Sequence, residues 1–146
     1  MTPLDDISQS IDIAAPVERV WRVLTSEGLV AEWLGCLGYR AVVGSVFYMQ
    51  PDAARRAAGD ATGATHCELL ALEAPALMTF SWFMPGTPKT TVNIALAPSG
   101  AGTRVTLTHS GWDQFDADQV RAIRDGLEGG WSSFVLPQLK RVAETA

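Results

Sequence analysis

The sequence predicts an α+β fold in which helices cover one face of an antiparallel sheet. Between residues 39 and 109, apolar and polar side chains alternate with the period of two that is typical of strands. From about Asp116 to Glu144, apolar side chains recur every three or four positions, which is typical of one long amphipathic helix. Because a run of strands precedes the long helix, the pattern favours an antiparallel sheet over a parallel α/β arrangement.

Length and composition limit the classes of protein to which the chain can belong. Its 146 residues are about one domain long, so we expect a single domain over residues 1–146. Hydrophobic residues make up 47% and charged residues 18%, which excludes a disordered polyelectrolyte. The net charge of −5 argues against a nucleic-acid partner, since such proteins present a basic surface. The sequence contains no secretory signal and no run of ~18 apolar residues, so we expect a cytoplasmic protein with no membrane span.

The N-terminal residues predict one strand and two short helices. Ile7, Ile11 and Ile13 alternate with polar residues, as in a half-buried strand. Pro16 suits the first turn of a helix, where its missing N–H needs no partner. Gly28 is expected to mark the break between the helices. Their apolar positions are Val17, Val20, Trp21 and Leu24 in the first helix, and Leu29, Val30, Trp33 and Leu34 in the second.

The central part of the chain predicts six strands. They are expected at 39–43 and 45–50, joined at Gly44, and at 65–73, 77–83, 90–97 and 103–109. Segments rich in proline and glycine separate the last four. Residues 51–64 have no apolar pattern, so we expect a long, mobile hairpin connection or a frayed helical turn there.

The C-terminal helix is expected to present a single apolar stripe. Pro137 lacks an N–H and should kink the helix. Gly126, Gly129 and Gly130 weaken its centre by roughly 1 kcal/mol each relative to alanine; they either admit a ligand or another backbone, or mark a break between two helices. The stripe consists of Val120, Ile123, Leu127, Trp131, Phe134, Gln138 and Val142.

Five short motifs, in the same order along the chain, resemble those of one protein superfamily. Residues 11–21, IDIAAPVERVW, resemble the I-x-APxxxVW opening of the START-like (SRPBCC) superfamily, and Glu32-Trp33-Leu34 lies where its members carry a tryptophan. Residues 68–82 resemble the passage G-x-v-x-e-i-x-P…L-x-x-T-W. Residues 102–112 resemble the strand G-T-x-v-t-l-t-H-x-G, and Gly130-Trp131 fits the last helix.

Together these motifs resemble the branch named after the activator of heat-shock protein 90 ATPase. The resemblance covers about residues 7–143. It implies a helix-grip (START-like, Bet v 1-like) fold: a curved antiparallel sheet wrapped around a long C-terminal helix, with two short helices after the first strand. It also implies a cavity between helix and sheet. The 51–64 connection is longer than the usual tight hairpin of the family and is expected to reshape one rim of that cavity.

Aromatic side chains are the main candidates for lining such a cavity, because apolar pockets with a few polar groups are typical small-molecule sites. The alternative is that these side chains only fill the core. Their placement on strand faces, on the helix stripe and, for Trp33 and Trp112, near the expected cavity mouth favours a pocket. The candidate ligand-binding residues are Trp33, Phe47, Tyr48, Met49, Phe80, Trp82, His109, Trp112, Trp131 and Phe134.

His109 is the only candidate for a catalytic role. It shares a strand face with Val105 and Leu107, and inside an apolar cavity it could orient a ligand, together with Tyr48, or transfer a proton. A carboxylate near His109 would form an acid–base pair with it, and Asp113, four residues later, is a candidate; the alternative is that Asp113 is a solvated surface group. The alternative is a structural histidine at the strand end. The sequence lacks the established nucleophile, zinc-protease and nucleotide-binding motifs.

We expect neither a metal nor a cofactor. Cys36 and Cys67 lack C-x-x-C spacing and are interpreted as reduced thiols. His66 and Cys67 are neighbours on a strand and should therefore point to opposite faces of the sheet.

The sequence favours a protein that binds a hydrophobic or aromatic small molecule, a lipid for example, between its long helix and its sheet. The resemblance leaves two alternatives open. One is a chaperone-linked or stress-response module that interacts with another protein. The other is a cyclase- or hydrolase-like enzyme that uses His109. Both a monomer and a homodimer are compatible with the sequence.

Overall fold

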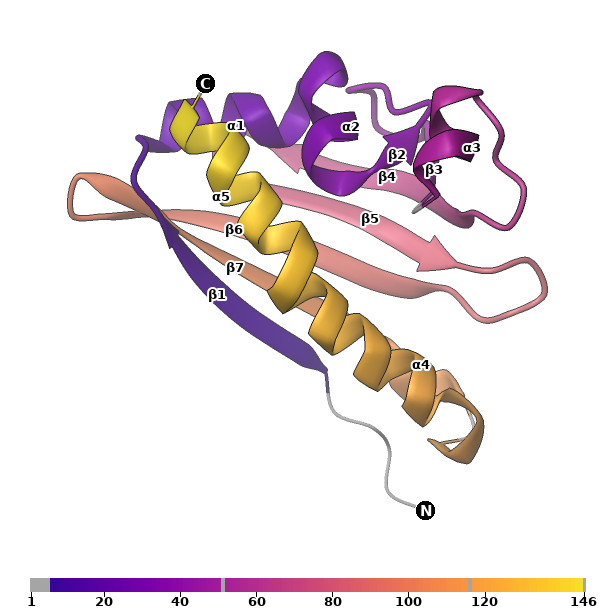
Figure 1. Ribbon diagram of the computed structural model, residues 1–146. Helices are drawn as coiled ribbons and strands as arrows, with labels where there is room; N and C mark the ends of the chain where they lie inside the picture. Colours follow the sequence, from indigo (N-terminus) through magenta and orange to yellow (C-terminus); the bar gives the residue numbers. More distant parts are fainter. Residues whose placement is uncertain (1–5, 51, 116, 146) are drawn as a thin grey trace.

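A curved antiparallel sheet and the helix across its concave face define the architecture (Figure 1). The computed structural model describes residues 6–50, 52–115 and 117–145. Within these residues, seven strands form one sheet in the order β1-β7-β6-β5-β4-β3-β2. Helices α1 and α2 pack against the C-terminal end of the long helix. This is the helix-grip arrangement that the resemblance implies.

The element bounds are as follows. The strands are β1 (Ile7–Ile13), β2 (Cys36–Leu37), β3 (Val46–Met49), β4 (Thr65–Glu73), β5 (Leu77–Phe83), β6 (Thr90–Ser99) and β7 (Gly102–Ser110). The helices are α1 (Val17–Thr25), α2 (Glu27–Leu34), α3 (Ala53–Ala57), α4 (Ala117–Gly130) and α5 (Leu136–Thr145). A 3-10 turn, η1 (Trp112–Gln114), precedes α4, and a π-helical turn, η2 (Trp131–Val135), joins α4 to α5.

The four strands predicted from residue 65 onward are confirmed, but the strand predicted at 39–43 is wrong. That segment is a tight loop between β2 and β3. The Ser45 hydroxyl donates to the carbonyl oxygens of Arg40 (3.0 Å) and Val42 (2.7 Å), which folds the segment back on itself. Gly38 and Gly44 bracket the loop with φ angles of 74° and 94°, a region that glycine adopts without strain. β3 pairs with β4 on one side and, on the other, with the shorter strand β2, which comes before the loop.

The break between α1 and α2 lies at Ser26, two residues before the predicted position at Gly28. The Ser26 N–H donates to the Arg22 carbonyl (2.9 Å) and closes α1. Its own carbonyl accepts the N–H groups of Leu29 and Val30 (both 3.0 Å) and opens α2. One extended residue therefore ends one helix and begins the next.

The C-terminal helix is continuous through η2, and this π turn corrects the predicted apolar stripe. The Leu136 N–H donates to the carbonyl of Trp131, five residues back, just before Pro137, which has no N–H to donate. The wide turn shifts the inward-facing positions by one residue. Phe134 and Gln138, both predicted to face inward, are consequently exposed, Phe134 at 69%. Ile123, predicted on the same stripe, lies before the turn in α4 and is also exposed, at 51%. Trp131 is buried as predicted, and residues following η2 complete the inner face: Leu136, Leu139, Val142 and Ala143.

The core lies between this inner face and the concave side of the sheet. Phe80, Ile94 and Leu107 of the sheet are fully buried, as is Leu139 on α5. The end of β1 is attached to α5 by polar contacts. The Lys140 ammonium donates to the Asp12 carbonyl (2.9 Å), and the Glu144 carboxylate accepts the Ala14 N–H (2.8 Å). The position of the helix over the sheet is therefore fixed at this end.

Gly102, at the start of β7, permits the tightest backbone approach among the described glycines, so Gly102→Ala should destabilise the fold. The added Cβ would overlap the carbonyl oxygen of Ile13, which belongs to backbone and cannot rotate away. We expect the free energy of unfolding in urea to fall by about 1–3 kcal/mol. Gly126→Ala is the matched control, because its Cβ meets no atom within 4 Å inside α4, and it should stabilise by up to about 1 kcal/mol. Equal stabilities of the two variants would contradict this account.

Candidate functional site

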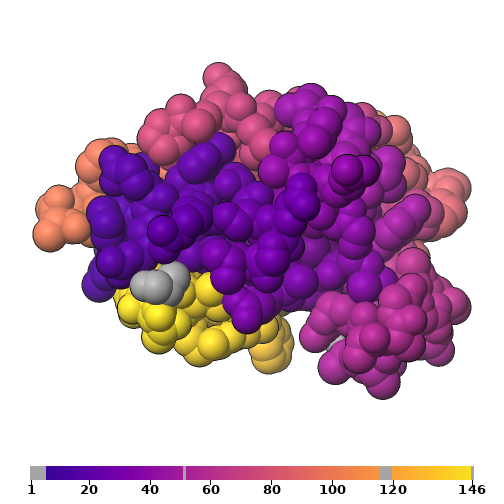
Figure 2. All heavy atoms as spheres, turned by 90° about the horizontal axis from the view of Figure 1, so that it is seen from above, coloured from indigo at the N-terminus to yellow at the C-terminus, as the bar shows by residue number. Residues whose placement is uncertain are grey.

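A cavity of about 470 Å³ lies between α2, the π turn η2 and the sheet. This volume is in the range of small-molecule sites. Seen from above in Figure 2, a notch separates the C-terminal helix (yellow) from the lobe that carries α3 (magenta). The helix, α2 and the α3 lobe all contribute lining residues.

The cavity walls are largely apolar and aromatic. Trp33 of α2 and Trp131 of η2 are each only 1% exposed, so their rings are fixed in the wall. The Trp33 indole N–H also donates to the Val23 carbonyl (3.1 Å), which anchors α2 on α1. Phe134, in contrast, lines the cavity while 69% exposed, and it therefore lies at the open side. Further apolar lining comes from Leu34, Met49, Trp82, Leu127 and Val135.

Four polar side chains of the described residues line the same space. Glu32 and Gln138 are exposed, whereas Arg56 and Thr65 are half-buried. The Thr65 hydroxyl has a long contact of 3.7 Å with the Met84 sulfur, a weak acceptor. The cavity thus combines an apolar body with a small number of polar groups at its edge.

The register of the sheet decides which strand side chains reach the cavity. Met49 is paired with Thr65, and both point to the concave face. Tyr48, the residue before Met49 on β3, points to the opposite face, where its ring contacts His66 at a centroid distance of 5.0 Å. Tyr48 is therefore not placed to orient a ligand in this cavity.

Half of the candidate ligand-binding residues line the cavity and half do not. Those that line it are Trp33, Met49, Trp82, Trp131 and Phe134. Phe47, Phe80, Trp112 and His109 are buried in the core instead, each at most 1% exposed. Phe47, Phe80 and His109 face the interior from their strands as predicted, but they are packed within the core and do not line the cavity. Trp112 opens the turn η1, where its indole N–H donates to the His109 carbonyl (3.0 Å).

His109 lies beneath the cavity wall in a fully directed hydrogen-bond network. The indole N–H of Trp131 can only donate, so His109 Nδ1 accepts it at 3.2 Å. The proton of the neutral ring is consequently on Nε2, which donates to Thr90 Oγ1 at 2.7 Å. The Thr90 hydroxyl in turn donates a hydrogen bond to the Trp82 carbonyl at 2.7 Å. Sheet and helix are therefore joined through one imidazole.

This environment keeps His109 neutral. Burial lowers its pKa to about 3, because the charged ring would lose its hydration. The rings of Trp82 and Trp112 enclose it at centroid distances of 5.5 and 4.6 Å. Both ring nitrogens are engaged, and no carboxylate is among the ring's contacts within the described residues. The candidate pairing with Asp113 is not formed, since Asp113 is an exposed surface group in η1.

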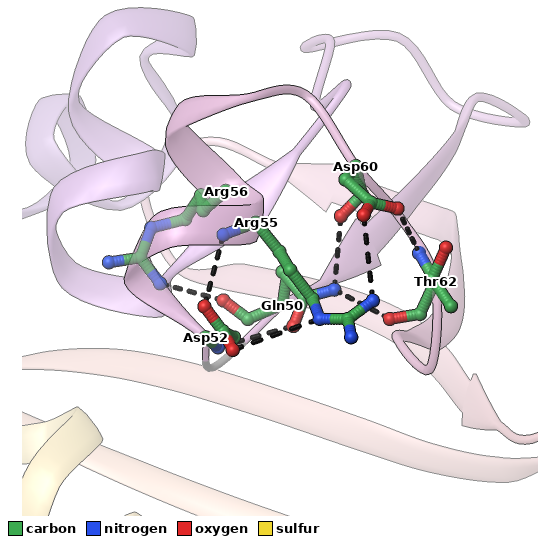
Figure 3. Close-up of polar contacts among 6 residues, drawn as sticks. All are labelled: Gln50, Asp52, Arg55, Arg56, Asp60 and Thr62. Atoms are coloured by element: carbon green, nitrogen blue, oxygen red, sulfur yellow. Dashed lines mark hydrogen bonds and ion pairs between the residues drawn. The ribbon is translucent and has the colours of Figure 1, made fainter.

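The segment 52–64 contains a site residue that the sequence pattern did not identify. Residue 51 lies outside the described structure, and the segment after it is ordered rather than a bare hairpin (Figure 3). Gln50 is 3% exposed, and its amide donates to the carbonyls of Asp60 and Thr62 (both 3.0 Å). The short helix α3 brings Arg56 into the cavity wall.

Local signals for α3 are present in the sequence, although they are weak. Asp52 precedes an alanine- and arginine-rich run, as an N-cap residue does. In the structure its carboxylate accepts the Arg55 N–H at 3.0 Å. The apolar pattern does not indicate that Arg56 rather than Arg55 faces the cavity. The orientation of the two side chains depends on the hydrogen bonds of Gln50 to the 52–64 segment and to Arg56.

The cysteines do not form a reactive site. Cys36 and Cys67 are buried free thiols on the concave side, and burial raises the pKa of both, that of Cys36 to about 12. His66 and Cys67 lie on opposite faces, as strand alternation requires. Among the described residues, no group of three His, Cys, Asp or Glu side chains could hold a metal ion. The helices of the described chain are too short or too polar to cross a membrane.

The sequence of residues 14–144 matches the family described as "Activator of Hsp90 ATPase homolog 1-like protein". The chain belongs to this family. No curated protein matches it. The family assignment agrees with the START-like resemblance and with the fold, and the helix-grip prediction is confirmed.

Solved structures reproduce the fold of this family member. A Bacillus halodurans protein is 24% identical with a TM-score of 0.75, over 99% of this chain and 100% of that one. DynU16, from the dynemicin biosynthetic locus, is 22% identical with a TM-score of 0.71, over 98% of this chain and 48% of that one. The Aha1 dimer from Colwellia psychrerythraea is 20% identical with a TM-score of 0.71, over 97% of both chains. At these identities the likeness concerns the fold alone.

The buried imidazole predicts a specific pH dependence of stability. Unfolded histidine has a pKa of about 6.5, whereas folded His109 stays neutral down to about pH 3. Below pH 6.5 the unfolded state binds a proton that the folded state does not bind. The free energy of unfolding therefore falls as the pH falls, by about 1.4 kcal/mol per pH unit. His109→Gln should remove this part of the slope between pH 6.5 and 5 in urea titrations. The control His66→Gln, on the outer face, should retain it; an unchanged slope in His109→Gln would contradict the prediction.

Gln50 predicts a local effect on the 52–64 segment. Gln50→Leu leaves the carbonyls of Asp60 and Thr62 without their donor, and we expect a loss of about 1–3 kcal/mol in stability. Hydrogen exchange of residues 52–64 should rise more than about ten-fold, while β6 and β7 stay protected. Gln138→Leu is the comparison, because this exposed side chain holds no part of the segment. Uniform exchange changes across the chain would show that Gln50 acts globally instead.

Proposed function

We propose that this protein binds a hydrophobic or aromatic small molecule in the cavity between α2, η2 and the sheet. The observation that carries the proposal is the 470 Å³ cavity with Trp33, Trp82, Trp131 and Phe134 in its wall. Three of these aromatic groups come from separate elements that the fold holds rigidly. The family assignment is compatible with this role, and the resemblance to START-like proteins supports a cavity for ligands.

The driving force for such binding is the burial of apolar ligand surface. Removing about 200 Å² of apolar surface from water contributes roughly 5 kcal/mol, before the loss of translational and rotational freedom. Rigid aromatic walls reduce the ordering cost on the protein side, because Trp33 and Trp131 are already held by hydrogen bonds. Phe134, exposed at the open side, is free to cover a bound molecule.

A second candidate function is interaction with another protein, a chaperone for example. The observation in its favour is an exposed aliphatic cluster where the β2–β3 loop meets the bulge of β4. Its members are Val42 (57% exposed), Val43 (56%), Val46 (49%) and Leu70 (42%). None of these four side chains lines the cavity, so variants can separate the two functions.

We do not propose the cyclase- or hydrolase-like alternative. It relies on His109, whose two ring nitrogens are both engaged by Trp131 and Thr90. A buried ring with a pKa of about 3 is also a poor proton acceptor at neutral pH.

A variant that fills the cavity tests the proposal. Gly130 lines the cavity in helical conformation (φ −65°, ψ −43°), and a Cβ there meets no atom within 4 Å. Gly130→Leu should therefore fold normally and weaken binding of the neutral probe 2-naphthaleneethanol at least ten-fold in isothermal titration calorimetry. Gly126→Leu is the matched control, since it has the same open surroundings within α4 but does not line the cavity.

The two variants gain similar helix propensity, so a difference between them reports on the cavity. Unchanged probe affinity in Gly130→Leu, or no binding to the native protein, would reject the proposal. In that case Val46→Ser and Leu70→Ser, tested in pull-downs with a purified chaperone, address the second candidate.

A further inference from the structure

We propose that the molecule bound in this cavity carries a carboxylate, and that Arg56 binds it. This inference rests on the proposed function and adds the chemical class of the ligand: an acid with an apolar alkyl or aryl body. Arg56 is the one cationic side chain among the described residues that line the cavity. It stands at the edge of a wall that is otherwise mainly aromatic and aliphatic.

The Arg56 side chain is held in position but not neutralised. Its Nη1 donates to the Gln50 carbonyl oxygen at 2.6 Å, which fixes the plane of the guanidinium. No carboxylate lies within 4.0 Å of it among the residues that the structure describes. A guanidinium has five N–H donors, so the Gln50 contact leaves donors for a planar, two-oxygen partner.

Arg55, the preceding residue, provides an internal contrast. Its guanidinium contacts two carboxylates on the surface, those of Asp52 (3.7 Å) and Asp60 (3.5 Å), as Figure 3 shows. These contacts keep Arg55 within its own segment and away from the cavity. Two adjacent arginines therefore have different roles: Arg55 stabilises the 52–64 segment, and Arg56 is presented to the cavity.

The residues around Arg56 leave space for its guanidinium and hold it in place. Gly35 ends α2 in the left-handed region with φ 69°, where a side chain is strained. A Cβ at Gly35 would also be 3.4 Å from Arg56 Nη1. Gln50, which accepts from Arg56, is itself buried and bonded to the 52–64 segment. Gly35, Gln50 and the helix α3 therefore together determine where the Arg56 guanidinium lies.

The other charged group at the cavity is Glu32, on the exposed side of α2. It makes no ion pair with Arg56 within 4.0 Å, and its exposure allows water to solvate it. Arg56 is half-buried beside apolar walls, where a charge-assisted hydrogen bond is stronger than in open water. A ligand with its acid group at Arg56 and its apolar body along Trp82 and Trp131 satisfies both parts of the cavity.

The test compares two probes that share a naphthalene ring and a two-carbon side chain: 2-naphthaleneacetate, which ends in a carboxylate, and 2-naphthaleneethanol, which ends in a neutral hydroxyl. Isothermal titration calorimetry of the native protein should give a Kd for the acid at least about ten-fold lower than for the alcohol. Arg56→Gln should remove this preference and leave the affinity for the alcohol unchanged. Arg55→Gln is the matched control and should keep the preference.

Two further measurements separate charge recognition from a structural effect. Raising NaCl from about 0.05 to 0.5 M should weaken binding of the acid and leave binding of the alcohol unchanged. Arg56→Lys keeps the charge but not the two-donor geometry, and should retain only part of the preference. Hydrogen exchange of residues 52–64 shows whether the segment is intact in each variant.

Equal affinity of the native protein for both probes would overturn this inference while leaving the proposed function standing, as would a full acid preference in Arg56→Gln. Absence of binding for both probes would reject the proposed function and, with it, the ligand class.

Discussion

The hydrogen bond from the Trp131 indole to His109 Nδ1 is the contact on which the arrangement of helix, sheet and cavity depends. It spans 3.2 Å between a helix residue and a strand residue that are 22 positions apart. Because the groups are buried from water, each donor needs an acceptor at its own position. The direction of the network, from Trp131 through His109 and Thr90 to the Trp82 carbonyl, therefore fixes the tautomer, the indole orientation and the height of η2 above the sheet. The Trp131 ring thus lies between His109 and the cavity, whose wall it forms.

The same contact divides the interior into two parts with different chemistry. On the core side of this contact, close-packed side chains such as Phe80 and Leu107 stabilise the fold and leave no space for a ligand. On the other, Trp33, Trp82 and Trp131 present rigid surfaces to an open volume, and the inserted helix α3 adds a single cation. The elements that form the scaffold are thus distinct from the segment that supplies the charge. Because the 52–64 segment contributes no strand to the sheet, it supplies this charge without taking part in the strand pairing.

Most of the fold was predictable from local patterns, whereas the site was predictable only in part. Strands β4 and β5 have the predicted bounds, because β-branched and aromatic residues alternate between turn-forming residues. The loop at 39–43 was not recognised, since its fold depends on hydrogen bonds from one serine side chain rather than on periodicity. Strand alternation correctly placed Met49 and Trp82 on the concave face, but it could not tell core from cavity, as Phe47 and Phe80 show. Arg56 lies in a segment without apolar pattern, and its direction is set by long-range contacts of Gln50.

The π turn has a consequence for which changes of length the chain tolerates. It contains one residue more than a regular helical turn, so the loss of one residue within 131–135 would restore an α-helix and leave the inward-facing positions after it unchanged. The loss of Gln138, within the regular helix α5, would instead rotate the rest of that helix by about 100°. Lys140 would then take the place of Leu139 and Glu144 that of Ala143, placing two charges in the core. Homologues of this chain should therefore vary in length at the π turn and beside the cavity, and keep an unchanged number of residues between Leu136 and the C-terminal end of the helix.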